Sequence, residues 1–270
     1  MSEAEPEYDL THIRFLEALW GEGYLSPGGA AEVDRVVADV PLAGKRVLDL
    51  GCGSGGVSIH RAKAHGAGEV VAVDVEDPVV EAARRRVAAE GLSDTVTVEH
   101  IAPGPLPFAD GSFDIVFSKD AMVHIPDKET LFADIFRVLR PGGCVAASDW
   151  LTSHDGPPSD DMRAYLEAEG LSFGMGSADR YRRALDAAGF VDIALTDRNT
   201  WYGQVAREER ARLEGPLYAE VAQEVGTYFV DKNIRTWTAM LKVLDSGEHR
   251  PTHLRAWKPG PGVDPADEEA

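Results

Sequence analysis

Short apolar runs alternate with amphipathic helical segments through the middle of the chain. The apolar runs have the length and the β-branched character of buried strands, and they lie at 46–50, 70–75, 95–101, 113–118 and 144–150. The segments between them carry apolar residues at helical spacing, at 57–65, 77–91 and 128–139. Strands that alternate with helices of about 10–15 residues predict βαβ units, and therefore a parallel sheet that helices cover on both faces.

The two ends of the chain follow a different pattern. Residues 8–20 carry apolar positions at helical spacing, with Trp20 expected to pack in a core, and a glycine-rich break separates them from a short helix at 31–39. After Trp150 the sequence predicts a helix at 160–169, and another between Ser177 as N-cap and Gly189 as C-terminal stop. A strand follows at 191–197, then a mostly helical, charged segment at 203–246 and a last strand at 253–258.

These patterns predict one α/β domain with additions at both ends. We expect an N-terminal helical cap over 1–40, a main domain over 41–258, and a helical lid or insertion around 203–246, before the last strand. The tail, 259–270, is acidic and rich in Pro and Gly, which is typical of disorder.

The composition narrows the range of partners. The formal net charge of −19 opposes binding to nucleic acid and to anionic membranes, so a small molecule is the expected partner. The two cysteines, Cys52 and Cys144, form no CxxC pair and no metal-ligand spacing, so we expect neither a disulfide nor a metal site. The chain has no signal-like N-terminus and no apolar run of about 18 residues, and we expect a cytoplasmic enzyme. The sequence leaves the oligomeric state open.

A glycine-rich loop follows the first predicted strand, in the segment VLDLGCGSGGVS. Gly51 and Gly53 stand where the backbone turns sharply and a ligand comes close, which a Cβ atom would hinder. Asp74 ends the next predicted strand, where an acid binds ribose hydroxyls in nucleotide-binding folds. The same letters fit a nicotinamide-binding loop, and Asp49 and Asp74 have purely structural alternatives as a buried turn acid and a strand-end charge.

The ordered set VLDLGCGSGG, VVAVDV, PLPFADGSFDIVFSKDAMVHIPD and LRPGGCVAASDW resembles the class I S-adenosylmethionine-dependent methyltransferases. The resemblance implies a Rossmann-like, seven-stranded, mostly parallel sheet whose last strand is antiparallel. It also implies S-adenosylmethionine as cofactor, with the methionine part held by the loop that contains Asp49, Gly51, Cys52 and Gly53.

The rest of the cofactor is expected at the ends of the next two strands. By the same resemblance, Asp74 binds the ribose and Val75 lies beside it. Ala102 stands where the family has an acid for the adenine amino group. We therefore expect the backbone of Ile101 and Ala102 to hold the adenine.

The segments YDLTHIRFLEALWGEGYLSPGG and SKDAMVHIPDKETLF resemble the phosphoethanolamine N-methyltransferases. The resemblance implies a catalytic pair of Tyr8 and His124 over the transferred methyl group. It also implies cofactor contacts from Ser26 and Lys119 and a substrate contact from Asp120. The alternative for Lys119 is a solvated charge at the end of a strand.

The predicted substrate side departs from that family. By spacing, Trp150, Glu169, Leu171 and Met240 occupy the positions at which the family binds phosphate, and all four lack the family's residues. Tyr165 matches directly, and we expect Tyr24, Trp150 and Tyr165 to contribute to an aromatic cage for a methylated ammonium. The segment 174–177 also resembles the sarcosine and dimethylglycine N-methyltransferases.

These observations favour N-methylation of a small amine other than phosphoethanolamine. A histidine suits the task of deprotonating an ammonium group, so His124 is the expected base. O-methylation of a secondary metabolite is the alternative within the same class. A nicotinamide oxidoreductase and a catalytically silent S-adenosylmethionine-binding regulator are the alternatives from other classes.

Overall fold

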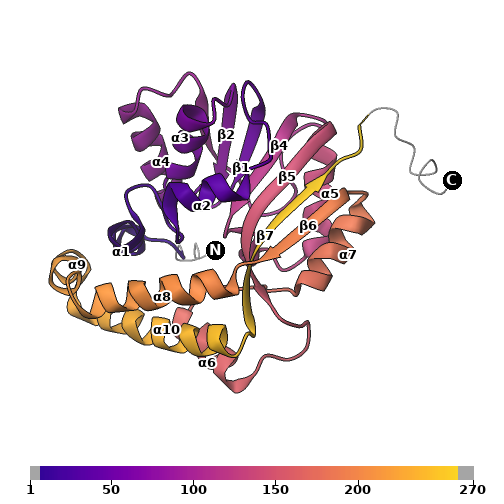
Figure 1. Ribbon diagram of the computed structural model, residues 1–270. Coiled ribbons are helices and arrows are strands. Elements are labelled where there is room, and N and C mark those ends of the chain that lie inside the picture. The colour runs from indigo at the N-terminus through magenta and orange to yellow at the C-terminus, as the bar shows by residue number, and fades with distance from the viewer. Residues whose placement is uncertain (1–6, 261–270) are drawn as a thin grey trace, which may run out of the picture.

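The computed structural model describes residues 7–260, which form a seven-stranded sheet with the strand order β3-β2-β1-β4-β5-β7-β6 (Figure 1). Strands β1 to β5 are parallel, and β7 is antiparallel to both of its neighbours, β5 and β6. The expected mostly parallel sheet with an antiparallel last strand is therefore confirmed. The strands are β1 Arg46–Leu50, β2 Glu69–Asp74, β3 Val96–His100, β4 Phe113–Lys119, β5 Leu139–Thr152, β6 Val191–Asp197 and β7 His249–Trp257.

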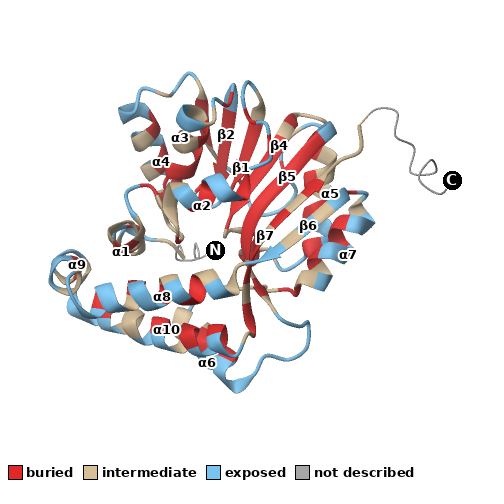
Figure 2. Ribbon diagram, in the orientation of Figure 1, coloured by how far each residue is buried: buried red, intermediate tan, exposed pale blue. Residues whose placement is uncertain are grey.

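Helices cover both faces of this sheet, as the alternating pattern predicts. One face packs against α2 (Gly29–Val36), α3 (Gly56–Ala64) and α4 (Asp77–Ala89), and the other against α5 (Lys128–Val138) and α7 (Ala178–Ala188). Figure 2 shows the central strands buried almost along their whole length between these two layers. Strands buried on both faces explain the continuous apolar runs in the sequence.

A third group of helices faces the carboxyl edge of the sheet (Figure 1). The group has its own apolar core, which includes Phe15, Tyr165, Tyr202 and Trp237. Its members are α1 Leu10–Trp20, α6 Asp160–Glu169, α8 Asn199–Glu214, α9 Tyr218–Val225 and α10 Thr227–Asp245. Helices α8 to α10 lie between β6 and β7 in the sequence and span residues 199–245.

Local features of the sequence account for several element ends. The side chain of Ser177 accepts a hydrogen bond from the Arg180 amide, and Gly189 ends α7 in the left-handed conformation, as predicted. Trp20 lies in the helical core, with its indole Nε1 2.6 Å from Glu209 and its ring against Trp237. One boundary differs from expectation, because β5 begins at Leu139, directly after α5, and not at the predicted position 144.

The described residues include only part of the predicted tail and part of the predicted cap. Of the predicted tail, 259–270, only the first two residues belong to the described part, and the first six residues of the predicted cap lie outside it. Both cysteines are buried and free. Across residues 7–260, no helix combines the length and the hydrophobicity that crossing a bilayer requires.

The cap meets the glycine loop through direct backbone contact. The Gly56 amide, at the start of α3, donates to the Gly23 carbonyl at 2.9 Å. A Cβ atom on Gly56 would lie 2.6 Å from that same oxygen, so only glycine permits this approach. Docking of the cap therefore requires a glycine at position 56.

A buried carboxylate ties the cap to the insertion and to the last strand. Glu32 of α2 is 2% exposed and accepts hydrogen bonds from Arg198, just before α8, at 2.9 Å and from His253 of β7 at 2.7 Å. Burial alone would raise the pKa of Glu32, but the bonds from His253 and Arg198 outweigh it and lower the pKa to about 2.

We expect Glu32→Gln to lower the free energy of unfolding by about 3 kcal/mol at pH 7, because it leaves the partly buried Arg198 guanidinium without its carboxylate partner. A depressed carboxyl pKa stabilises the fold above the unfolded value of about 4.5, and this contribution is lost as the pH falls towards 2. The difference between wild type and variant in urea unfolding should therefore be full at pH 7 and should shrink below pH 4.5. The exposed Glu224→Gln serves as control, and an equal loss in both variants would contradict the assignment.

Candidate active site

A cavity of about 700 Å³ lies at the carboxyl edge of the sheet, between the strand ends and the cap. This is the edge at which open α/β sheets bind their ligands, and the volume lies within the range of small-molecule sites. Its walls come from the loops after β1, β2, β3 and β4, from cap residues 7–8 and 23–26, and from Ser172. The cavity contains most of the residues that the sequence analysis selected.

The glycine loop forms one wall of this cavity. Gly51 has a φ of +73°, and a Cβ atom on it would lie 2.2 Å from the Cβ of Ala121, so no other residue fits. Gly53 and Cys52 also line the cavity, whereas Asp49 lies behind it, fully buried and 2.5 Å from the Ser58 hydroxyl. Burial raises the pKa of Asp49 to about 6. The structure thus favours the structural alternative for Asp49.

Asp74 presents a fixed carboxylate at the end of β2. It accepts hydrogen bonds from the amides of Gly53 at 3.0 Å, Val75 at 2.8 Å and Glu76 at 3.2 Å. A carboxylate has about four acceptor positions, so these three bonds leave capacity for a ligand hydroxyl. Burial raises the pKa of Asp74 despite these bonds.

Beyond Asp74 the cavity continues along an apolar slot. Val75, Ile101 and Ala102 line it, together with the turn from Pro103 to Leu106. The expected acid is indeed missing, since a methyl side chain stands at Ala102. The glycine cradle, the fixed Asp74 and this apolar slot fit the methionine, ribose and adenine parts of S-adenosylmethionine.

The end of β4 carries a buried ion pair between two neighbouring residues. The Lys119 ammonium lies 2.9 Å from Asp120, and it also donates to the Ser26 hydroxyl at 2.6 Å and to the Pro27 carbonyl at 2.8 Å. Lys119 is 6% exposed, so the alternative of a solvated strand-end charge is wrong. The lysine instead fixes the cap segment against the strand end.

Asp120 is held in an unusual backbone conformation. Its φ is +56°, which is costly for a residue with a Cβ atom and often marks functional positions. Its second carboxylate oxygen accepts from the Ser148 hydroxyl at 2.8 Å, and its side chain faces the cavity. The aspartate is therefore positioned rigidly at the cavity wall.

Tyr8 and His124 meet in the same cavity, although they lie far apart in the sequence. The Tyr8 hydroxyl is 3.4 Å from His124 Nε2, and the two rings lie edge to face with centroids 5.9 Å apart. The structure therefore brings the predicted catalytic pair together. Burial lowers the pKa of His124, which favours the neutral imidazole that a base requires.

Glu7 is a site residue that the sequence reasoning missed. Its carboxylate lies 3.4 Å from His124 Nδ1 and accepts from the Ser172 amide at 3.3 Å, while the Ser172 carbonyl lies 3.2 Å from the same Nδ1. Two acceptors at Nδ1 place the ring proton there and leave the Nε2 lone pair facing Tyr8. No local motif could reveal this contact, which depends on how the cap lies on the domain.

Two buried residues hold the short turn that carries His124. Lys128 is 0% exposed and donates to the carbonyls of Met122 at 2.5 Å and Ile125 at 2.6 Å. Asp149 accepts from the Val123 amide at 2.9 Å. The sequence showed these residues only as a helix start and a strand residue, so their role in positioning His124 comes from the structure.

The predicted aromatic residues divide into two groups. Tyr24 lines the main cavity. Trp150 lies beyond Asp120, in a small second cavity of about 10 Å³ that shares Lys119 and Asp120 with the first. Tyr165 is buried in the helical core near Trp150, and the ring of His249 lies between them, 5.0 Å from Trp150 and 5.7 Å from Tyr165.

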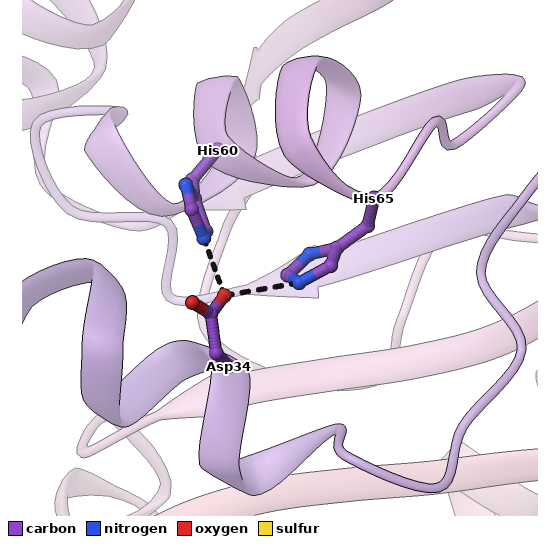
Figure 3. Close-up of side chains that lie close together, drawn as sticks. All are labelled: Asp34, His60 and His65. Carbon is purple, nitrogen blue, oxygen red and sulfur yellow. Dashed lines mark hydrogen bonds and ion pairs between the residues drawn. The ribbon is translucent and has the colours of Figure 1, made fainter.

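One group of possible metal ligands occurs in the described part of the chain, outside the main cavity. Asp34 of α2 lies 2.5 Å from His60 Nε2 and 3.0 Å from His65 Nε2, as Figure 3 shows. Arg61 faces His65 Nδ1 at 3.2 Å, where a metal-bound imidazole would need an acceptor for its remaining proton. The arrangement fits a polar link between α2 and α3 better than a metal site.

Comparisons with known proteins also indicate a methyltransferase. Residues 47–143 match a family model described as a methyltransferase domain. Phosphoethanolamine N-methyltransferase 1 of Triticum aestivum is 33% identical over 90% of this chain and 48% of its own length. The 27-O-demethylrifamycin SV methyltransferase of Amycolatopsis mediterranei is 32% identical over 77% of this chain and 83% of its own length. The chain thus spans about half the length of the first relative and most of the second.

Solved structures of methyltransferases share the fold of this chain. Phosphoethanolamine N-methyltransferase 2 of Haemonchus contortus, in complex with phosphomonomethylethanolamine and S-adenosylhomocysteine, aligns with a TM-score of 0.86 and 27% identity over 94% of this chain and 59% of that one. A Galdieria sulphuraria protein described as a sarcosine dimethylglycine methyltransferase shares the fold, with a TM-score of 0.80 and 21% identity over 92% of this chain and 97% of that one. The similarity to these methyltransferases argues against a nicotinamide-binding role for the glycine loop. The chain belongs to the class I S-adenosylmethionine-dependent methyltransferases, and S-adenosylmethionine is its cofactor.

Proposed function

We propose that the protein transfers a methyl group from S-adenosylmethionine to a small-molecule amine. The observation that carries the proposal is the contact between Tyr8 and His124, in the same cavity as Asp120 and the glycine loop. A relative named as an N-methyltransferase for phosphoethanolamine supports the choice of nitrogen as acceptor. Ser26, Lys119, Asp74 and the backbone of Ile101 and Ala102 are the proposed cofactor contacts.

The chain's own residues must hold the amine and remove its proton. When bound, S-adenosylmethionine supplies an electrophilic methyl group, and only a nitrogen with a free lone pair can attack it. Aliphatic amines are protonated near neutral pH, and the Asp120 carboxylate attracts that ammonium form. His124 Nε2 then accepts a proton, directly or through the Tyr8 hydroxyl, which passes its own proton to Nε2 as it receives one from the amine.

Tyr8 acts as a neutral group in this scheme. Burial raises its pKa well above the ordinary value, and the carboxylates of Glu169 and Asp74 raise it further, so the phenol keeps its proton. His124 becomes an imidazolium, whose Nδ1 proton faces the Glu7 carboxylate and the Ser172 carbonyl. Since Tyr8 belongs to the proposed cap over 1–40, the pair forms only when the cap covers the cavity.

The acceptor we propose is not phosphoethanolamine itself. Met240 is 3% exposed and receives the Tyr202 hydroxyl at 3.7 Å, and Trp150 stacks on His249, so these two positions offer no cation to a phosphate. Glu169 would repel a phosphate. O-methylation is a second candidate, supported by the relative that acts on 27-O-demethylrifamycin SV. His124 would then deprotonate a hydroxyl group.

A cytoplasmic location is part of the proposal. Two free, buried cysteines suit a reducing compartment. Cell fractionation of the native host would test it, and recovery of the protein outside the cytoplasm would refute it.

The first test incubates the protein with methyl-labelled S-adenosylmethionine and a panel of amines, amino acids and hydroxylated metabolites. We expect label on an amine nitrogen, located by mass spectrometry. Label only on hydroxyl or carboxylate oxygens would replace the proposal by the O-methylation alternative. Cofactor binding without turnover on any member would favour the silent regulator.

Replacing His124 by Ala should lower kcat by roughly 10²- to 10⁴-fold, because the acceptor then has no base. Calorimetry should show unchanged binding of S-adenosylhomocysteine, which separates loss of the base from loss of the fold. His154→Ala, which changes a histidine outside the cavity, is the matched control. A rate for His124→Ala equal to that of the control would remove this residue from the mechanism.

Replacing Glu7 by Gln tests its action through His124. The Glu7 charge raises the pKa of His124 against the effect of burial, so the variant should have a lower His124 pKa. The base must be neutral to act, and the acidic limb of the kcat/KM profile should therefore move to lower pH. Glu22→Gln, on the exposed part of the cap, should leave the profile in place. A slower Glu7→Gln variant with an unmoved acidic limb would show that Glu7 is only structural.

A further inference from the structure

The walls of the main cavity are strongly acidic. Six of the residues that line it carry a carboxylate: Glu7, Asp74, Glu76, Asp120, Asp127 and Asp134. Two lining residues, Lys119 and His124, can carry a positive charge. Burial lowers the pKa of His124, so its imidazole is neutral at pH 7 and Lys119 is the one cation among the described lining residues.

Lys119 has no proton left to offer a ligand. A lysine ammonium has three N–H donors. Here they go to the Ser26 hydroxyl at 2.6 Å, the Pro27 carbonyl at 2.8 Å and the Asp120 carboxylate at 2.9 Å. A carboxylate or phosphate on the acceptor would have to displace one of these partners.

Most of the lining carboxylates have no cationic partner in the fold. Asp120 is paired with Lys119 at 2.9 Å, and Asp134 with Arg137 at 2.7 Å. Across residues 7–260, no lysine or arginine forms an ion pair with the other four, which are Glu7, Asp74, Glu76 and Asp127. The cavity therefore presents an excess of negative charge to any ligand.

The cationic side chains that flank these walls are bonded to the fold and do not line the cavity. Lys128 donates to two backbone carbonyls, at 2.5 and 2.6 Å. Arg180 is paired with Glu129 at 2.8 Å, and His100 Nε2 lies 2.9 Å from a backbone carbonyl. None of them is available to an acceptor inside the cavity.

The backbone donors at this wall are also occupied. The first turn of a helix attracts anions, and α5 begins at the cavity. Its N-cap residue, Asp127, already accepts from the Thr130 amide at 2.9 Å and from the Thr130 hydroxyl at 2.7 Å. The position at which an anion of the acceptor could bind this helix is therefore filled by a carboxylate of the chain itself.

We propose that the acceptor is an amine that carries no anionic group, which excludes amino acids as well as phosphorylated amines. Like charges brought together in a binding site are strongly unfavourable, and walls of one sign attract a cation during encounter. S-adenosylmethionine suits the same walls, because its carboxylate is accompanied by its own ammonium and sulfonium groups. This inference rests on the proposed amine methylation and names the class of acceptor.

The test compares two secondary amines, N-methylethanolamine and sarcosine, which differ in a hydroxymethyl group against a carboxylate. We expect wild type to favour the amino alcohol by about 100-fold in kcat/KM, because the carboxylate meets only like charges. Butylamine and γ-aminobutyrate form a longer pair, for which the same order is expected. Added salt should reduce both preferences, since it screens the charges at the cavity rim.

Asp120→Asn tests the wall next to the base. Asparagine tolerates the left-handed conformation of this residue, and its amide oxygen can still accept from Ser148. The variant removes one carboxylate and leaves Lys119 without its anionic partner. The ratio of the two kcat/KM values should therefore move towards sarcosine by about tenfold, whatever the absolute rates are.

Asp127→Asn provides a second variant at the exposed rim, where folding is not at risk because asparagine also caps helices. It should move the same ratio towards sarcosine by about two- to threefold, the size of a solvent-screened charge effect. Asp94→Asn removes an exposed carboxylate outside the cavity and should leave the ratio unchanged.

Calorimetry with S-adenosylhomocysteine present gives a readout that needs no turnover, and the amine without a carboxylate should bind more tightly in each pair. Equal or better use of sarcosine and γ-aminobutyrate by wild type would overturn the inference while leaving amine methylation in place. A ratio unchanged in both cavity variants, or a wild type that binds neither N-methylethanolamine nor butylamine, would overturn it as well. Label found only on the oxygen of N-methylethanolamine would instead refute the proposed function.

Discussion

The ion pair between Lys119 and Asp120 is the interaction on which the site depends. It joins the end of β4 to the cap through Ser26 and Pro27 and to β5 through Ser148. Two opposite charges buried this deeply are stable only when every remaining donor and acceptor is satisfied, and here the cap supplies the missing partners. The cavity, the strained Asp120 backbone and the placement of Tyr8 all follow from a cap that is fixed at this point.

Much of the fold could be predicted because each layer has a distinct signature in the sequence. Buried parallel strands appear as continuous apolar runs, and glycines appear where backbones touch, as at Gly51 and Gly56. The cofactor wall was predictable for the same reason, since it consists of strand ends and their first loop residues. Lys119 was harder to interpret, because a lysine at a strand end looks solvated until its partners from the cap are known.

The site residues that could not be predicted from the sequence depend on contacts between distant segments. Glu7, Lys128 and Asp149 act on His124 or its turn through contacts that only the tertiary structure creates. No spacing rule connects a cap carboxylate to a histidine more than a hundred residues later. The predicted substrate residues were ambiguous for a related reason. Trp150 and Tyr165 both pack in the helical core, and only Trp150 also lines the small second cavity, a difference that the sequence does not reveal.

The contacts of Glu7 also have a kinetic meaning. Its backbone amide lies 3.3 Å from Glu76, two residues after Asp74, while its side chain reaches His124 and Ser172. The first residues of the described chain thus cross the cavity between its two halves like a strap. A molecule held at Asp74 would lie beneath this segment. Exchange at Asp74 is thereby tied to movement of the first cap residues, a kind of step that often limits turnover.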